Sequence, residues 1–304
     1  MRKRLKLGLA LGGGFLRGTA HIGFIDVLER EGIEVDLIAG ASAGSIVAAL
    51  YAQGGLSPAE MEKTALGLTA RDVFDMCPTV GNLLLVGGKV VADVFRLPFP
   101  FRSPLGLMKG DRLERLVNQW VGQTRTFAQL QKSLAIVSVD VNTGTLVVFL
   151  AGGFLSRTVI PPEDKIFIEG VTVARAVRAS CAVPGMFEPV AMGRRLLVDG
   201  GIRNNVPADI VRQMGADVVV AVDVGYDGNT CKNVASMTEL LSQSLDIMGT
   251  EGVTHRLDKF ADVVVRPVIK NVSPWDFNQI EYCIGQGRRA GSEAVPAIRR
   301  ALGL

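Results

Sequence analysis

The chain begins with two consecutive units of strand, glycine-containing turn and helix, and this repetition restricts its fold more than any other feature. In each unit a short apolar run precedes a turn with glycine, and a helical pattern follows. The first unit comprises residues 6–11, 12–18 and 19–31, and the second comprises residues 35–39, 40–44 and 45–53. Alternation of this kind favours parallel strands with helices packed against them.

Further apolar runs rich in β-branched residues follow, and helical stretches separate most of them. They occupy residues 134–139, 146–150, 216–224 and 261–265. The pattern predicts an α/β fold of three layers, α/β/α, with a mainly parallel central sheet. A chain of 304 residues can bury roughly 75% of its unfolded surface in one core. We therefore expect a single domain over residues 1–304, with two domains as the alternative.

Residues 77–108 interrupt this regularity. They contain the apolar run from Leu83 to Val86 and three phenylalanines, Phe95, Phe99 and Phe101, among several prolines. The pattern suits neither a strand nor a long helix. We interpret the segment as an inserted lid or surface segment, and a peripheral helical pair packed on the core is the alternative. Exposed apolar patches often mark contacts with ligands or membranes.

Composition excludes several classes of function. The 33 Lys and Arg against 30 Asp and Glu leave a formal net charge of +3, too small to indicate a nucleic-acid partner. The four cysteines form no C-x-x-C pair, which argues against a zinc site or a disulfide framework and fits a reducing compartment. With only two histidines, a cage of imidazoles has almost no ligands. We expect no metal, no cofactor and no nucleic acid, and no oligomeric state is indicated.

Two apolar segments imitate export or membrane signals. The basic start and residues 5–16 resemble a signal peptide, but three glycines interrupt the run, and Arg17 stands where a small-residue cleavage site should be. Residues 37–59 carry no charge for 23 positions, yet glycines and polar residues divide them into a strand, a turn and a short helix. We expect a cytoplasmic protein, with transient contact at the inner membrane surface as a further hypothesis.

The turn of the second unit, Gly40-Ala41-Ser42-Ala43-Gly44, matches the motif G-x-S-x-G. It lies between a buried strand and a helix, as a nucleophilic serine requires. Gly40 and Gly44 remove side chains that would collide with the neighbouring strand and helix. The helix N-terminus also favours a developing negative charge. Ser42 is therefore a candidate nucleophile, and a purely structural turn is the alternative.

The glycine-rich loop of the first unit lies at the end of the neighbouring strand. Its sequence is Gly12-Gly13-Gly14-Phe15-Leu16-Arg17-Gly18. Its consecutive N–H groups are suited to an oxyanion or a phosphate. The Lys-Ser/Thr ending of a phosphate-binding loop is missing, so the serine turn favours the oxyanion. Arg17 is interpreted as a cation that braces the loop or lies near the developing charge, with a plain salt bridge as the alternative.

An activated serine needs a base, and the two histidines are poor candidates. His21 lies in the first helix, where a structural hydrogen bond is the better interpretation, and His255 lies in a charged helical stretch, where we expect it at the surface. Asp199 instead follows the apolar run Leu196-Leu197-Val198 and precedes two glycines. A carboxylate at such a strand end can serve as base if it bonds directly to the serine in a partly desolvated pocket. Taken alone, Asp-Gly-Gly is usually just a turn.

Together these elements resemble the patatin-like phospholipase family, and specifically its bacterial branch related to the catalytic domain of neuropathy target esterase. The resemblance covers most of the chain. Its motifs are the glycine loop with Arg17 and His21-Ile22-Gly23, the turn at residues 40–45, residues 179–184 with Phe187 and Pro189, and residues 198–201 with residues 204–207.

The resemblance implies roles for individual residues. Ser42 becomes the nucleophile and Asp199 the base of a Ser-Asp dyad. The loop around Gly13, Gly14 and Phe15, with Arg17, becomes the oxyanion hole. The supporting glycines are Gly12, Gly18, Gly40, Gly44, Gly200 and Gly201. Relatives commonly carry a fourth glycine where this chain has Phe15, so the size of the acyl group it accepts is left open.

The resemblance also implies a function, the hydrolysis of carboxylic esters in phospholipids or lysophospholipids through an acyl-enzyme. The retained nucleophile, base and glycine loop favour this over a catalytically silent lipid-binding regulator. A soluble carboxylesterase or thioesterase acting on small acyl substrates is the other alternative. A nucleotide-binding protein ranks third.

Overall fold

The computed structural model describes residues 4–75, 80–98, 100–101, 104–152, 164–225, 237–273 and 275–304. Its strands are β1 (Leu7–Leu11), β2 (Leu37–Gly40), β3 (Gly106–Met108), β4 (Ser133–Asp140), β5 (Thr145–Leu150), β6 (Lys165–Ile168), β7 (Gly185–Phe187), β8 (Val190–Met192), β9 (Arg195–Asp199), β10 (Val218–Val222) and β11 (Val263–Val265). The helices that precede β4 are α1 (Ala20–Arg30), α2 (Ala43–Ala52), α3 (Pro58–Leu66), α4 (Ala70–Val73), α5 (Val80–Val94) and α6 (Asp111–Val121). Those that follow β6 are α7 (Val173–Ser180), α8 (Gly201–Asn204), α9 (Ala208–Gln213), α10 (Met237–Phe260) and α11 (Ile280–Leu302). Short 3-10 helices span Phe15–Thr19, Phe127–Gln129 and Phe277–Gln279.

The central sheet has the strand order β11-β10-β1-β2-β4-β5-β6. The strands from β11 to β4 run parallel, and the register places Leu9 of β1 beside Ile38 of β2 and Val220 of β10. β5 is antiparallel to β4, and β9 also pairs with β4 in the antiparallel direction. The predicted sheet is therefore confirmed in its parallel part, while the strands around β4 add an antiparallel edge.

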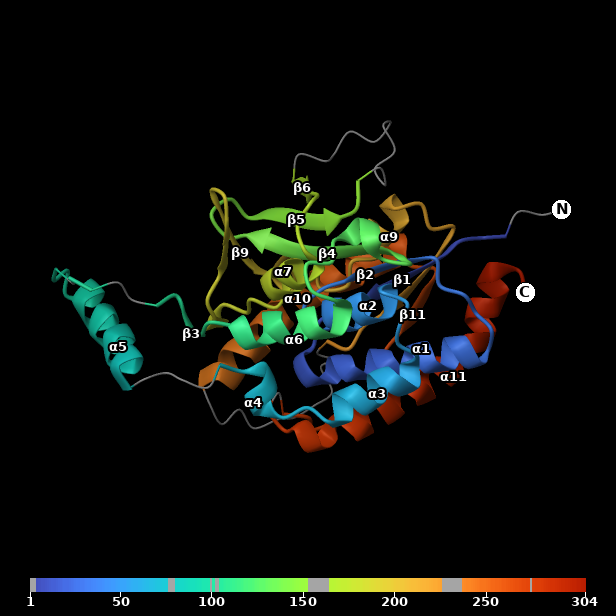
Figure 1. The fold of residues 1–304 in the computed structure, drawn as a ribbon, viewed down its shortest axis with the longest axis horizontal. Coiled ribbons are helices and arrows are strands. Elements are labelled where there is room, and N and C mark those ends of the chain that lie inside the picture. Colours follow the sequence, from blue (N-terminus) through green and yellow to red (C-terminus); the bar gives the residue numbers. More distant parts are fainter. Residues whose placement is uncertain are drawn as a thin grey trace.

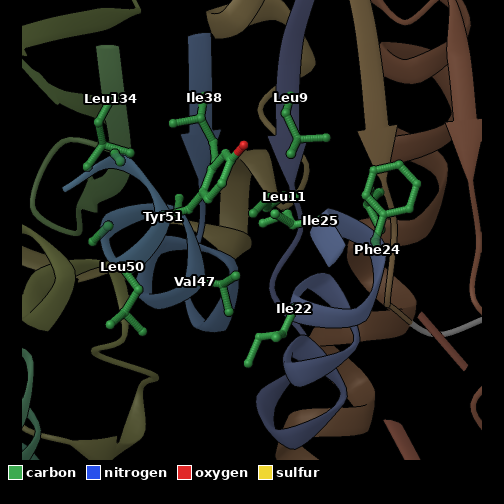
Figure 2. Close-up of a cluster of buried hydrophobic side chains, with 14 of the residues drawn as sticks. Leu9, Leu11, Ile22, Phe24, Ile25, Ile38, Val47, Leu50, Tyr51 and Leu134 are labelled. Carbon is green, nitrogen blue, oxygen red and sulfur yellow. The ribbon is translucent and has the colours of Figure 1, made fainter. Parts of the chain in front are cut away.

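Helices cover both faces of the sheet, which confirms the predicted three layers (Figure 1). Because side chains alternate along a strand, Leu9 and Leu11 pack on one face against α1 and α2, whereas Ala10 packs on the other face with α9 and α10. Figure 2 shows part of the first interface, where Ile22 of α1 and Val47 of α2 lie below the strands. Central strands buried on both faces explain the continuous apolar runs in the sequence.

The segment predicted as an insertion contains α5, a helix of 15 residues, so the expectation that its pattern does not suit a long helix is wrong. Three side chains on one side of this helix are apolar and exposed, Val90, Val91 and Val94. In Figure 1, α5 stands apart from the body of the molecule, at the left of the view. The side chains of Leu83, Val86 and Phe99 lie outside the described residues. Whether the segment acts as a lid stays a prediction.

Across the described ranges, no helix is both long enough and apolar enough to cross a membrane. The two ends of the described chain lie on the same side of the view in Figure 1. The carboxyl ends of β1 and β2 lead into the glycine loop and into Ser42. In an open parallel sheet, this edge is where ligands bind.

Candidate active site

Ser42 occupies a sharp turn between β2 and α2. Its backbone angles are φ 49° and ψ −127°, in a region that residues other than glycine rarely adopt. A side chain at Gly40 would approach the carbonyl oxygen of Gly44 to 2.6 Å, and one at Gly44 would approach that of Leu11 to 2.3 Å. The two glycines are therefore required by close packing, as predicted. Strained backbone of this kind is typical of functional turns.

Two neighbouring serines hold the turn in place. The backbone N–H of Ser42 donates to Oγ of Ser180, at 2.9 Å, and Oγ of Ser45 donates to the carbonyl oxygen of Ser42, at 2.6 Å. Both supporting serines are completely buried. Sequence reasoning assigned no role to either of them, because only the fold brings Ser180 against a turn 138 residues earlier in the chain.

Asp199 lies at the end of β9 and is 5% exposed. Its backbone N–H donates to the carbonyl oxygen of Ala182, at 3.0 Å, and its Oδ1 accepts from the N–H of Gly201, at 2.7 Å. Ala182 follows Ser180 by two residues, so the segment that holds the Ser42 turn also holds the end of β9. The structure therefore brings the two predicted catalytic residues to one corner of the sheet.

Asn205 links the glycine loop to the segment after Asp199. The N–H of Gly13 donates to the side-chain Oδ1 of Asn205, at 3.1 Å, and to its backbone oxygen, at 3.2 Å. Side chains added at Gly13 and Gly201 would both meet this amide, at 2.7 and 2.8 Å, and the one at Gly13 would also meet Cβ of Ser42, at 2.8 Å. The side chain of Asn205 thus lies between the glycine loop, beside Ser42, and the segment that follows Asp199, and it connects the two.

The glycine loop presents its amides unequally. Because Gly13 donates to Asn205, its N–H is already engaged, and that of Gly12 donates to the carbonyl oxygen of Val222, at 3.0 Å. The N–H groups of Gly14 and Phe15 donate to no acceptor within the described part of the chain. Phe15 has a positive φ of 51°. Of the predicted oxyanion donors, Gly14 and Phe15 are therefore better placed than Gly13.

Arg17 braces the glycine loop. Its Nε donates to the carbonyl oxygen of Gly14, at 3.3 Å, and its side chain also donates to that of Gly225, at 3.3 Å, in the loop after β10. These bonds agree with the bracing role that the sequence suggested. They tie the first loop of the sheet to the loop of the adjoining strand.

The histidines lie as the sequence predicted. His21 is completely buried, and its Nε2 is 2.7 Å from the carbonyl oxygen of Gly12. Burial lowers the pKa of His21 to about 4, and the contact with Gly12 opposes that shift. The ring is therefore neutral at pH 7 and donates to the loop. His255 is exposed on α10.

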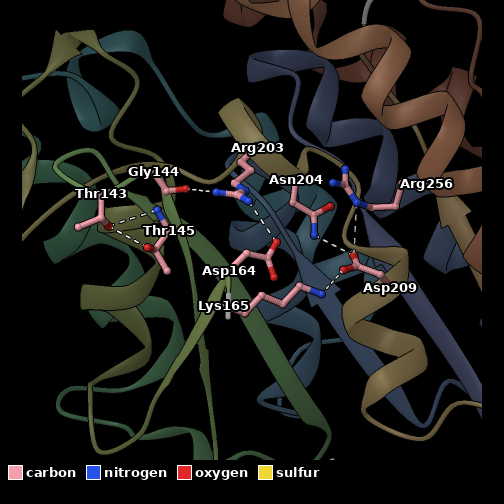
Figure 3. Close-up of polar contacts among 9 residues, drawn as sticks. All are labelled: Thr143, Gly144, Thr145, Asp164, Lys165, Arg203, Asn204, Asp209 and Arg256. Carbon is pink, nitrogen blue, oxygen red and sulfur yellow. Dashed lines mark hydrogen bonds and ion pairs between the residues drawn. The ribbon is translucent and has the colours of Figure 1, made fainter. Parts of the chain in front are cut away.

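A buried polar cluster anchors the helices that follow Asp199 (Figure 3). Asp209 of α9 accepts from Nζ of Lys165, at 2.6 Å, and from Nδ2 of Asn204, at 2.8 Å, and Nε of Arg256 lies 3.8 Å away. The side chains of Asp209 and Lys165 are 6% and 10% exposed. The cluster holds Asn204, and with it the adjacent Asn205, in place.

An apolar cavity of about 140 Å³ opens beside Ser42. Its lining includes Phe15 of the glycine loop, Ile46 of α2, Met61 of α3 and Trp120 of α6. Cys181 also lines it, and burial, with a smaller contribution from the Asp199 carboxylate, raises the pKa of this thiol, so it is not a competing nucleophile. The cavity can hold a hydrocarbon chain whose reacting end lies at the Ser42 turn.

The described residues contain no group of three His, Cys, Asp or Glu that could hold a metal ion. Cys77 and Cys231 lie outside the described residues, while Cys181 and Cys283 are buried free thiols. The groups present at this corner are the hydroxyl of Ser42, the carboxylate of Asp199 and the backbone amides of the glycine loop.

Comparison with known proteins gives a consistent result. The family model described as patatin-like phospholipase matches residues 9–212. An uncharacterised NTE family protein of Mycobacterium tuberculosis is 26% identical over 315 aligned positions, which cover 96% of this chain and 46% of that protein. Human patatin-like phospholipase domain-containing protein 6 is 29% identical, covering 86% of this chain and 16% of that protein. The chain thus spans less than half the length of these relatives.

A curated relative from Aspergillus fumigatus, named lysophospholipase nte1, is 31% identical over 74% of this chain and 12% of its own length. Among solved structures, the type III effector protein ExoU has a TM-score of 0.50 and 17% identity, covering 98% of this chain and 54% of that chain. At this identity the structural likeness concerns the fold alone.

Proposed function

Because the chain belongs to the patatin-like phospholipase family, we propose that it hydrolyses the carboxylic ester bonds of phospholipids or lysophospholipids. One observation carries the proposal: a serine in a strained turn lies at the wall of an apolar cavity. The position of Asp199 at the same corner supports it. The names of the relatives, which include a lysophospholipase, point to the same class of substrate.

In the proposed reaction, Oγ of Ser42 attacks the ester carbonyl carbon while Asp199 accepts the hydroxyl proton. The tetrahedral intermediate collapses, the C–O bond to the alcohol breaks, and the alcohol leaves with the proton from Asp199. Water, deprotonated in turn by Asp199, then attacks the acyl-enzyme. The C–O bond to Oγ of Ser42 breaks, Asp199 returns the proton to this oxygen, and the fatty acid leaves. The N–H groups of Gly14 and Phe15 would stabilise both oxyanions.

The cavity supports a lipid substrate over a small ester. Its lining is mainly aliphatic and aromatic, and it extends from Ser42 past α2 to residues of α3 and α6. Such a surface gains free energy by removing an acyl chain from water, about 0.8 kcal/mol for each buried CH₂. The turnover number divided by KM should therefore rise with acyl length among p-nitrophenyl esters. A preference for acetyl over longer esters would favour a soluble esterase or thioesterase.

The nucleophile is tested by labelling the full chain with a fluorophosphonate. The wild-type protein should be labelled, Ser42→Ala should not, and Ser244→Ala, which alters an exposed serine of α10, should behave as the wild type. Turnover of lysophospholipid by Ser42→Ala should fall by at least about 10⁴-fold, as for other nucleophile deletions. Equal labelling of the Ser42→Ala protein would refute the assignment, and no labelling of any form would favour a silent lipid-binding protein.

The base is tested by Asp199→Asn, which keeps the shape of the side chain and removes its basicity. We expect turnover to fall by about 10³-fold or more, with an unchanged midpoint of thermal unfolding. Asp258→Asn, at an exposed position of α10, is the matched control and should retain full activity. Full activity of Asp199→Asn would show that another group accepts the proton.

A further inference from the structure

Helix α5 and the residues just after it expose an unusual amount of apolar surface. Leu84, Val94 and Phe95 are 69%, 70% and 68% exposed. Figure 1 shows α5 away from the layers of the fold. We refer to the described residues 80–98 as the arm. Single exposed apolar residues are common, whereas a contiguous group marks an interaction surface.

The exposed apolar residues of α5, together with Phe95 directly after it, lie on one side of the helix. Leu84, Val91 and Phe95 follow one another at spacings of seven and four residues, and Val90 and Val94 extend the same face at a spacing of four. Lys89 and Asp93, which pair with each other, lie on the opposite side, and Arg96 follows the helix with a positive φ of 54°. The arm is therefore an amphipathic helix whose apolar face is exposed as far as the described residues show.

The arm leaves the body beside the cavity. Phe74, which precedes it, and Met108, which follows it, belong to one apolar cluster with Met186 and Phe187. The rings of Phe74 and Phe187 lie 5.9 Å apart, and both side chains line the cavity next to Ser42. The arm is therefore connected to the body through residues that pack at the wall of the cavity.

The charge of residues 76–109 indicates which kind of surface the arm binds. Between residues 76 and 109 the sequence has four cations, Lys89, Arg96, Arg102 and Lys109, and one anion, Asp93. Lys89 pairs with Asp93 on the polar side of α5, so the excess positive charge comes from Arg96, Arg102 and Lys109, which follow the helix in the sequence. An amphipathic helix with neighbouring cations binds in the interface of a lipid bilayer, with its apolar face among the acyl chains and the cations near anionic headgroups. A purely apolar protein partner would give no reason for this excess of positive charge.

We propose that the apolar face of the arm docks on the surface of an anionic phospholipid bilayer and holds the cavity at that surface. This inference rests on the proposed function, because a lipid hydrolase must withdraw its substrate from a bilayer or micelle. The docking itself needs neither Ser42 nor Asp199. Binding to lipid and hydrolysis of lipid can therefore be measured separately.

The test is sedimentation of the full chain with vesicles of phosphatidylcholine and phosphatidylglycerol. A variant carrying Val91→Gln, Val94→Gln and Phe95→Gln should partition to these vesicles at least about tenfold more weakly than the wild type, because each change removes apolar area from the interface. Vesicles of phosphatidylcholine alone should bind the wild type more weakly than the anionic vesicles do.

The matched control carries Ile247→Gln, Val268→Gln and Leu304→Gln, three exposed apolar positions outside the arm, and should sediment as the wild type does. Both triple variants should hydrolyse a water-soluble short-chain ester at the wild-type rate, and Ser42→Ala should bind vesicles normally. Equal binding by the arm variant, or no binding by the wild type, would overturn the proposal. So would a dimer in analytical ultracentrifugation that the arm substitutions dissociate, since a second copy would then cover this face.

Discussion

At the scale of single residues, the site depends on the strained backbone of the Ser42 turn and on the buried side chains that hydrogen-bond to it. Ser42 keeps a positive φ, which costs of order 1–3 kcal/mol, and its N–H is held by Ser180. The strain persists because buried partners on both sides of the turn determine its conformation. The same turn places Ser42 in the lining of the cavity.

Burial disfavours the charged form of the His21 ring in the folded protein, which makes the free energy of unfolding depend on pH. Its pKa is about 4 in the folded protein and about 6.5 in the unfolded chain. Between these values the unfolded chain binds the extra proton, so stability is retained above pH 6.5 and falls as the pH drops toward 4. We expect a loss of about 3 kcal/mol from this group, measured by urea unfolding across that range.

The matched variants for this prediction are the two histidine substitutions. His21→Gln should be less stable than the wild type at pH 7, because the bond to Gly12 is altered, and should have a shallower slope of stability against pH. His255→Gln changes an exposed residue and should keep the wild-type slope. If His21→Gln kept that slope too, other groups would account for the acid sensitivity.

The sequence predicts residues whose chemistry is local, and misses those that act through distant contacts. The G-x-S-x-G turn identifies Ser42 because strand, turn and helix are adjacent in the chain. Nothing near Asn205 indicates that it binds the N–H of Gly13, 192 residues earlier. Ser180 lay inside the motif of the resemblance, yet its contact with Ser42 depends on how α7 packs against the turn.

At the scale of elements, the placement of α8 and α9 depends on one buried acid. Asp209→Ala would leave the ammonium group of Lys165 buried without its carboxylate. Breaking a buried ion pair in this way destabilises proteins by about 3–5 kcal/mol, and we expect a loss of this size in urea unfolding. Glu293→Ala, which breaks the exposed pair with Arg289, should lose less than about 1 kcal/mol. If both substitutions lowered the free energy of unfolding by the same amount, burial of the Asp209–Lys165 pair would not explain its contribution.

A helix or strand could be predicted where its own residues carry the pattern. The prediction was weaker where the position of a strand depends on which other strand it pairs with. The parallel strands β1, β2 and β10 follow from apolar runs between helices. The antiparallel pairing of β9 with β4 could not be derived, because an apolar run does not encode its partner or its direction. Helix α5 was missed because Gly87 and Gly88 interrupt a run of apolar residues that has few polar positions.

At the scale of the whole molecule, the core and the arm have separate physical roles. The buried apolar residues lie between the sheet and the helices on its two faces, so the free energy of folding comes mainly from those contacts. The arm keeps Val91 and Val94 exposed and adds little to that free energy. Its apolar surface is retained for an interaction outside the fold.

Replacing the arm together with its flanking residues, 76–105 in all, with a short glycine and serine linker should therefore leave the midpoint of thermal unfolding within about 2 °C of the wild type, which corresponds to less than about 1 kcal/mol. Truncation after residue 289 is the contrasting change, because it removes Val295 and Ile298, which are buried in the core, and it should lower the midpoint steeply or abolish cooperative unfolding. Calorimetry of both proteins measures the two effects. A fall of more than about 5 °C on removing the arm would show that it packs on the body, since the loss of a solvated helix cannot account for such a change.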